Sequence, residues 1–151
     1  MSRDLAAELA TVLEAAGLGL TRPPASGANL FTAPMPEVDG SVPDRAVALV
    51  VTGGAGPLPY LGLGRKAYLS PGCQVRIRSA REDFEGGQSL ALAVFAALNQ
   101  TPDMSSATVR AEESAPVYMG TDGADRHRWG INLMVGFIAS ATARKPSAGV
   151  V

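Results

Sequence analysis

The segment CQVRIRSAREDFEGGQSLALAVFAALN (residues 73–99) decides the fold class, because its hydrophobic period changes once along its length. Apolar and polar residues alternate from Cys73 to Ser79, which predicts a half-buried strand with one polar face. From about Arg81 to Asn99 the apolar residues recur at helical spacing, which predicts a helix. The helix face expected to meet the core carries Phe84, Gln88, Ala91, Leu92, Phe95 and Leu98.

Toward the N-terminus, a second helix is predicted from Ser2 to Ala16. Its apolar residues also recur at helical spacing, Ser2 is a suitable N-cap, and Gly17 follows as a typical glycine terminator. Residues 19–44 are rich in proline and predict a loop, with one short extended piece around residues 28–32.

The remaining strands are predicted at Ala46–Val51, Thr108–Ser114 and Arg126–Ile138, with a hairpin-like turn at Asp122-Gly123 before the last of them. The order of helix, strands, helix and strands predicts an α+β fold, in which two main helices pack on a mostly antiparallel sheet of about four to five strands. One domain over residues 1–138 is expected, followed by a tail (139–151) that is mobile or ordered by a partner.

Composition narrows the class of function. The chain has 151 residues, a formal net charge of −1 and a pI near 5.8, which argues against strong binding of nucleic acid phosphates. Its single cysteine, Cys73, and single histidine, His127, are too few for an internal disulfide or a Cys/His zinc site. No apolar stretch reaches the length of a membrane span, and the charged start MSRDLAAELA favours synthesis and assembly in the cytoplasm.

The glycine-rich segment TGGAGPLPYLGLGRK (residues 52–66) follows an apolar strand, as phosphate-binding loops do. A P-loop needs a hydroxyl residue after its lysine, but Lys66 is followed by Ala67. The dinucleotide pattern starting at Gly54 has Pro59 in place of its third glycine. We therefore expect an extended surface loop that contacts a protein. A small nucleotide- or anion-binding enzyme using residues 53–66 is the alternative from another class.

The sequence shows no pattern that predicts a group of catalytic side chains. His127 lies between Arg126 and Arg128, and no G-x-S-x-G nucleophile motif is present. Glu112 and Glu113 are neighbours in a predicted strand, so their side chains should point to opposite faces. Cys73 falls on the apolar face of its strand, and the only tryptophan, Trp129, is expected in the core. No enzymatic activity and no cofactor are predicted.

The polar face of the 73–79 strand carries Gln74, Arg76 and Arg78, and Arg110 is expected on a neighbouring strand. Two readings remain open for this face. It is either a solvated surface or a contact surface for another subunit, because arginine is enriched in interfaces.

Two segments together resemble the tail terminator proteins of long-tailed bacteriophages, a group also described as tail completion or minor capsid proteins. Residues 71–99 resemble that family's strand-then-helix core, with matches at Pro71, Gly72, Gln74, Val75, Arg76, Ile77 and Arg78. Residues 114–137 resemble its closing hairpin, with matches at Pro116, Gly120, Asp122, Gly123, Arg126, Trp129 and Asn132.

The resemblance implies a structural virion protein of the tail or neck. In that family, six copies form a ring that caps the finished tail tube, stops its polymerisation and joins the head-side connector, and double-stranded DNA passes through the lumen. The partners implied are other copies of the chain, the major tail tube protein and the connector or stopper protein, and no membrane. Another neck component, such as an adaptor, stopper or tube-like subunit, is the alternative. The residues expected to contact neighbours are Tyr60, Leu61, Leu63, Arg65, Lys66, Gln74, Arg76, Arg78, Asp122 and Arg126.

Overall fold

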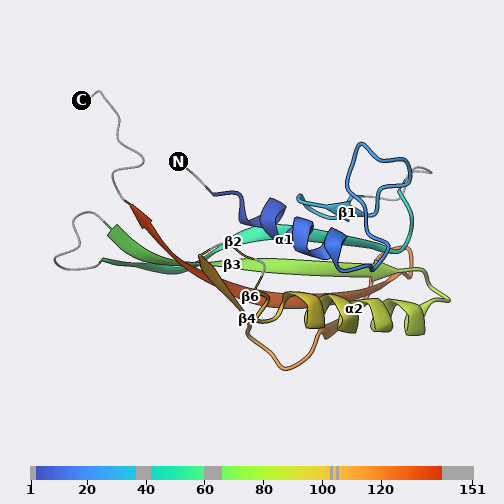
Figure 1. The fold of residues 1–151 in the computed structure, drawn as a ribbon. Coiled ribbons are helices and arrows are strands. Elements are labelled where there is room, and N and C mark those ends of the chain that lie inside the picture. The colour runs from blue at the N-terminus through green and yellow to red at the C-terminus, as the bar shows by residue number, and fades with distance from the viewer. Residues whose placement is uncertain (1–2, 37–41, 60–65, 103, 105, 141–151) are drawn as a thin grey trace.

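The chain folds as a six-stranded, mostly antiparallel sheet with two helices packed against it (Figure 1), in a computed structural model that describes residues 3–36, 42–59, 66–102, 104 and 106–140. The elements are α1 (Leu5–Ala15), β1 (Leu30–Phe31), β2 (Ala46–Pro59), β3 (Lys66–Ser79), α2 (Phe84–Leu98), β4 (Ala107–Ala111), β5 (Val117–Thr121) and β6 (His127–Ser140). The predicted α+β class is confirmed, although the sheet has six strands where four to five were expected.

The sheet order is β1-β2-β3-β6-β4, and β5 pairs with the start of β6. Among the described strands, β1 and β2 form the one parallel pair. The two helices contact each other and lie side by side on one face of the sheet, α1 over β2 and α2 over β3 and β6 (Figure 1). The opposite face, here called the open face, carries no helix (Figure 1).

The N-cap of helix α1 lies two residues later than the sequence predicted. This cap is Asp4, whose carboxylate accepts a hydrogen bond from the Ala7 backbone N–H at 3.1 Å, whereas the predicted cap, Ser2, lies outside the described residues. Gly17 has φ +75°, the left-handed conformation expected of a glycine that follows a helix. The helix buries Leu9 and Leu13 completely.

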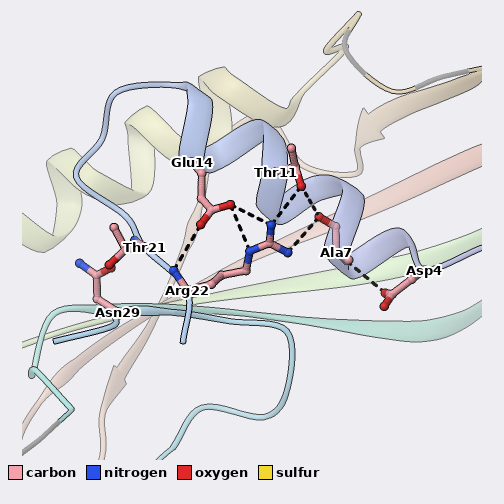
Figure 2. Close-up of polar contacts among 7 residues, drawn as sticks. All are labelled: Asp4, Ala7, Thr11, Glu14, Thr21, Arg22 and Asn29. Atoms are coloured by element: carbon pink, nitrogen blue, oxygen red, sulfur yellow. Dashed lines mark hydrogen bonds and ion pairs between the residues drawn. The ribbon is translucent and has the colours of Figure 1, made fainter. Parts of the chain in front are cut away.

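A single arginine ties the segment after α1 back onto that helix (Figure 2). Arg22 donates from Nη2 to Glu14 Oε1 at 2.8 Å and to Thr11 Oγ1 at 3.2 Å. Nearby, the Thr21 backbone N–H donates to Asn29 Oδ1 at 2.9 Å. These bonds fix the turn that leads into β1, so part of the predicted proline-rich loop is held by polar contacts.

The core lies between the helices and the odd-numbered residues of β3 and β6. Its largest fully buried side chains come from both helices and all the long strands: Leu9, Leu13, Leu30, Leu49, Ile77, Leu98, Ile131 and Leu133. Trp129 is buried, which confirms its predicted place in the core. In α2, however, Phe84 and Leu92 are exposed, while Leu90 and Val94 point inward. Ala91 and Leu98 are buried as predicted and Phe95 packs against the core, so the predicted face overlaps the real one but is rotated from it.

The rotation of α2 follows from the close approach of its first turn to the sheet. At Gly87 a Cβ atom would come 2.6 Å from Trp129 Cζ3 and 2.6 Å from Ser79 Cβ. Only glycine fits this position, and its absence of a side chain sets which face of the helix reaches the sheet.

The prediction of a surface loop over residues 52–66 was wrong for the described part of that segment, and residues 60–65 lie outside the described residues. β2 continues to Pro59 and β3 already begins at Lys66, so both sides of the glycine-rich segment are strands. Together with the end of β6 they form a three-stranded ribbon, here called the extension (residues 53–59, 66–71 and 137–140), which runs beyond the helices (Figure 1). The glycines and prolines of this segment predicted a loop. In the structure, a register shift after Thr52 accommodates Gly54 at φ +70° within the strand.

Strand β5 was not predicted, because VYMGT has no apolar alternation. The expected hairpin turn is present: the Asp122 carboxylate accepts from the backbone N–H groups of Ala124 at 2.8 Å and Arg126 at 3.0 Å. This turn joins β5 to β6, whereas β4, the predicted hairpin strand, pairs farther along β6.

Candidate functional site

A cavity of about 180 Å³ opens on the open face of the sheet, where the prolines before β2 and the β5–β6 turn approach each other. Its wall combines residues from four separate parts of the chain: Met35, Arg76, Ile77, Arg78, Asp122, Arg126 and Arg128. Four of these seven are arginines and one is an aspartate. The sequence had singled out Arg76, Arg78, Asp122 and Arg126 separately, and the fold brings them to one place.

Arg78 is the structural centre of this wall. Its guanidinium donates to three backbone carbonyls, those of Asp44 at 2.9 Å, Pro36 at 2.7 Å and Pro43 at 3.0 Å. The residue is only 3% exposed. The sequence placed Arg78 on an exposed polar face, but the chain's own loop covers it because the guanidinium fork can bind several carbonyls at once.

Arg76 lies two residues before Arg78 on the same face of β3 and is only partly buried. Its Nε donates to Gln74 Oε1 at 2.9 Å, and Gln74 Nε2 donates to Asn132 Oδ1 at 3.2 Å. These bonds form a polar chain from β3 to β6. Among the described residues Arg76 forms no ion pair, so its charge is not neutralised there by a carboxylate.

Arg126 has two carboxylate partners among the described residues. Its Nε lies 2.9 Å from Asp122 Oδ2, and its Nη1 lies 4.0 Å from Asp44 Oδ1. Burial alone would raise the pKa of Asp122, but hydrogen bonds from the backbone of Arg126 and Ala124, together with the Arg126 charge, lower it overall. Asp122 is therefore an anion at neutral pH and fixes both the turn and Arg126.

Arg128 was not predicted as a site residue. It lies directly opposite Arg78 in the β3–β6 register, and its Nη2 donates to the carbonyls of Met119 and Thr121, both at 3.1 Å. Its Nε is buried and has no hydrogen-bond acceptor among the described residues. The alternation of Arg126, directly before β6, with Arg128 and Asn132 on β6 could have indicated it. Met35 gave no signal, because it lies in the proline-rich segment.

The other predicted contact residues lie away from the cavity. Lys66 is exposed at the start of β3, within the extension. Tyr60, Leu61, Leu63 and Arg65 fall outside the described residues.

The extension carries a second feature, a row of side chains across three strands. Leu58 pairs with Tyr68 and Tyr68 with Ile138, so these residues share one face of the ribbon. Leu58 is 62% exposed and Ile138 is 55% exposed, the highest values among the exposed large apolar residues. We call Leu58, Tyr68 and Ile138 the apolar row.

The surroundings of His127 and Cys73 suit structural roles for both side chains. His127 Nδ1 lies 2.8 Å from the Tyr118 hydroxyl and Nε2 lies 2.9 Å from the Arg81 carbonyl, so Nε2 donates and Nδ1 accepts. Burial raises the pKa of Cys73 to about 12, which keeps it a neutral thiol at physiological pH.

Neither helix within the described residues is long and apolar enough to cross a membrane. In the same part of the chain, no three His, Cys, Asp or Glu side chains gather in a way that could hold a metal ion.

No protein-family model matches this chain, and no curated protein sequence matches it either.

Proposed function

We propose that this chain is a structural subunit that assembles with copies of itself into a ring at the end of a phage tail. The observation that carries the proposal is the extension, in which three strands run past the helices and present the apolar row to solvent. Soluble proteins rarely leave such a surface uncovered unless a partner binds there.

The edges of the extension support the same conclusion. β1 pairs only with Val47 and Ala48 of β2, and β4 pairs with β6 only as far as Phe137. Beyond these points, the outer edges of β2 and β6 have no partner among the described strands. An exposed edge offers backbone N–H and C=O groups to a strand of another subunit, while the apolar row offers buried area. A neighbouring copy would supply both.

The resemblance to tail terminators gives this assembly a specific identity. In the proposed ring, six copies cap the completed tail tube, prevent further addition of tube protein and present a surface to the head-side connector. Double-stranded DNA passes through the lumen without specific binding, in keeping with a net charge of −1. The protein would act in the virion after assembly in the host cytoplasm, with no catalytic role and no cofactor.

The experiment compares the oligomeric state of the wild type with that of Leu58→Glu combined with Ile138→Glu. We expect hexamers for the wild type, alone or on added tail tubes, by native mass spectrometry and negative-stain microscopy. The double variant should remain a folded monomer, because two buried charges would oppose the contact. Leu92→Glu is the matched control, since Leu92 is an exposed apolar residue on α2, away from the extension.

A wild type that stays monomeric with and without tail tubes would disprove the proposal. Loss of assembly in Leu92→Glu as well would place the contact elsewhere. A ring that binds isolated heads but not tubes would instead indicate an adaptor or stopper, the other neck component that the sequence left open.

A further inference from the structure

We propose that the arginine-lined cavity binds one oxyanion, a carboxylate or phosphate group, held between the guanidinium groups of Arg76 and Arg128. This site is separate from the extension, so it does not depend on whether the apolar row forms a subunit contact. The proposal rests on the donors that face the cavity, on their spacing and on the charge of its wall.

The first observation concerns the hydrogen-bond donors of Arg76 and Arg128. Arg76 uses Nε for Gln74, and its two Nη groups have no acceptor among the described residues. Arg128 uses Nη2 for two carbonyls of β5, while its buried Nε has no acceptor in the same part of the chain. A buried donor without an acceptor is costly, and an oxyanion is the acceptor that satisfies a guanidinium best.

The spacing suits one shared ligand. Arg76 pairs with Gly130, and Arg128 lies two residues before Gly130 on the same face of β6. Such diagonal neighbours have backbones about 7–8 Å apart, within reach of two long side chains that converge on one group. Gly130 adds no side chain between them, although the Met119 sulfur lies close to its backbone.

The charge of the wall favours an anion. Four arginines and one aspartate line the cavity, and the aspartate is paired with Arg126, so the charges available to an anion are those of Arg76 and Arg128. Asp122 is occupied by Arg126 and by two backbone N–H groups, so it does not neutralise Arg76 or Arg128.

The size of the cavity limits the ligand to a single group. Its volume of about 180 Å³ is below the about 300–1,000 Å³ of pockets that enclose drug-sized ligands. Asp122 in the wall and Asp44, 4.0 Å from Arg126, would repel the flanking phosphates of a nucleic acid strand. A single carboxylate or phosphate avoids that repulsion.

The test titrates the full chain with sodium phosphate and with sodium acetate at constant ionic strength, with chloride as the reference anion. Arginine Nε–H resonances and calorimetry report binding. We expect one saturable site for at least one of the two oxyanions and a shift of the Arg128 Nε–H signal. Arg76→Met and Arg128→Met should each weaken binding by about tenfold or more, equal to about 1.4 kcal/mol. Arg110→Met, an exposed arginine on β4, is the matched control and should bind as the wild type does.

The two anions separate the possible sources of the group. Tighter binding of acetate would indicate a protein carboxylate, and tighter binding of phosphate a phosphorylated molecule. Three results would overturn the proposal: no response beyond that of chloride, an equal loss in Arg110→Met, or binding only of a DNA duplex with a steep salt dependence. If Arg128→Met does not fold, Arg76→Met decides the outcome alone, because within the described part of the chain the Arg76 side chain bonds only to Gln74.

Discussion

Arg78 on β3 and Arg128 on β6 stand directly opposite each other, and both are held by backbone carbonyls. Like charges in this position normally destabilise an antiparallel pair. Here the two guanidinium groups bind different segments, Arg78 the prolines before β2 and Arg128 the strand β5. Arg78 therefore anchors the irregular proline-rich segment and Arg128 anchors strand β5, and the cavity lies between the anchored pieces.

Replacing Arg78 by methionine should lower the free energy of unfolding by about 3 kcal/mol or more, because three backbone carbonyls lose their donor. Arg76→Met is the control, since that side chain is partly exposed and makes one side-chain hydrogen bond; we expect a change below about 1 kcal/mol. Urea denaturation followed by Trp129 fluorescence measures both. Equal destabilisation of the two variants would contradict the anchoring role of Arg78.

The comparison of Arg78→Met with Arg76→Met also bears on any test of ring assembly. A ring that is lost in Arg78→Met cannot be assigned to a broken subunit contact, because the loop beneath it is disturbed as well. Arg76→Met leaves that loop in place, so it is the variant that separates folding from contact on this face.

Gly54→Ala should destabilise the extension, because residue 54 has φ +70° and lies against the neighbouring strand. A Cβ there would come 2.6 Å from both the Gly72 nitrogen and Pro71 Cα, and these are backbone atoms that cannot turn away. We expect a loss of about 2 kcal/mol or more. Gly53→Ala is the control, since its Cβ would meet nothing within 4 Å.

Hydrogen exchange of the amides in residues 66–71 would localise the effect. Faster exchange in Gly54→Ala than in Gly53→Ala is the expected result. Indistinguishable exchange and stability in the two variants would mean that the strands do not cross so closely at this point.

Gly87→Ala tests the explanation for the rotated face of α2, which is the close approach of the helix to the sheet at residue 87. Alanine gains about 1 kcal/mol of helix propensity over glycine. At residue 87 its Cβ would press on Trp129 and Ser79 in a packed core, where overpacking costs about 1–3 kcal/mol. We expect net destabilisation and a shifted Trp129 emission maximum.

Gly86→Ala is the matched control on the same helix turn. A Cβ there would meet only the ends of Arg45 and Asp83, an exposed ion pair that can move aside. This variant should be neutral or slightly stabilised, with unchanged Trp129 emission. A destabilised Gly86→Ala alongside a stable Gly87→Ala would reverse the assignment.

The sequence predicted those elements whose period is uninterrupted. The alternation around Val75 and the helical repeat before Leu98 were enough for β3, α2 and the α+β class. Local patterns could not show that Gly54 sits in a bulge, since glycine and proline signal loops unless a neighbouring strand is known. The burial of Arg78 depends on Pro36 and Pro43, which are distant in the chain. The cavity could not be predicted from the sequence, because it depends on how β3, β6 and the β5–β6 turn are paired in the fold.

Cys73 gives the last prediction, a dependence of stability on pH. Burial raises the pKa of its thiol to about 12, whereas an unfolded cysteine titrates near about 8.5. Between these values the folded chain keeps a proton that the unfolded chain loses, so stability must fall as the pH rises. The slope from this group approaches at most about 1.4 kcal/mol per pH unit above about pH 9.5, and it falls close to zero below about pH 7. This slope can be measured from denaturation curves of the wild type and Cys73→Ala at about pH 8, about pH 9.5 and about pH 10.5. The stability difference between the two should shrink with rising pH, because groups other than Cys73 titrate alike in both. A constant difference would show that the thiol ionises as freely in the folded chain as in the unfolded one.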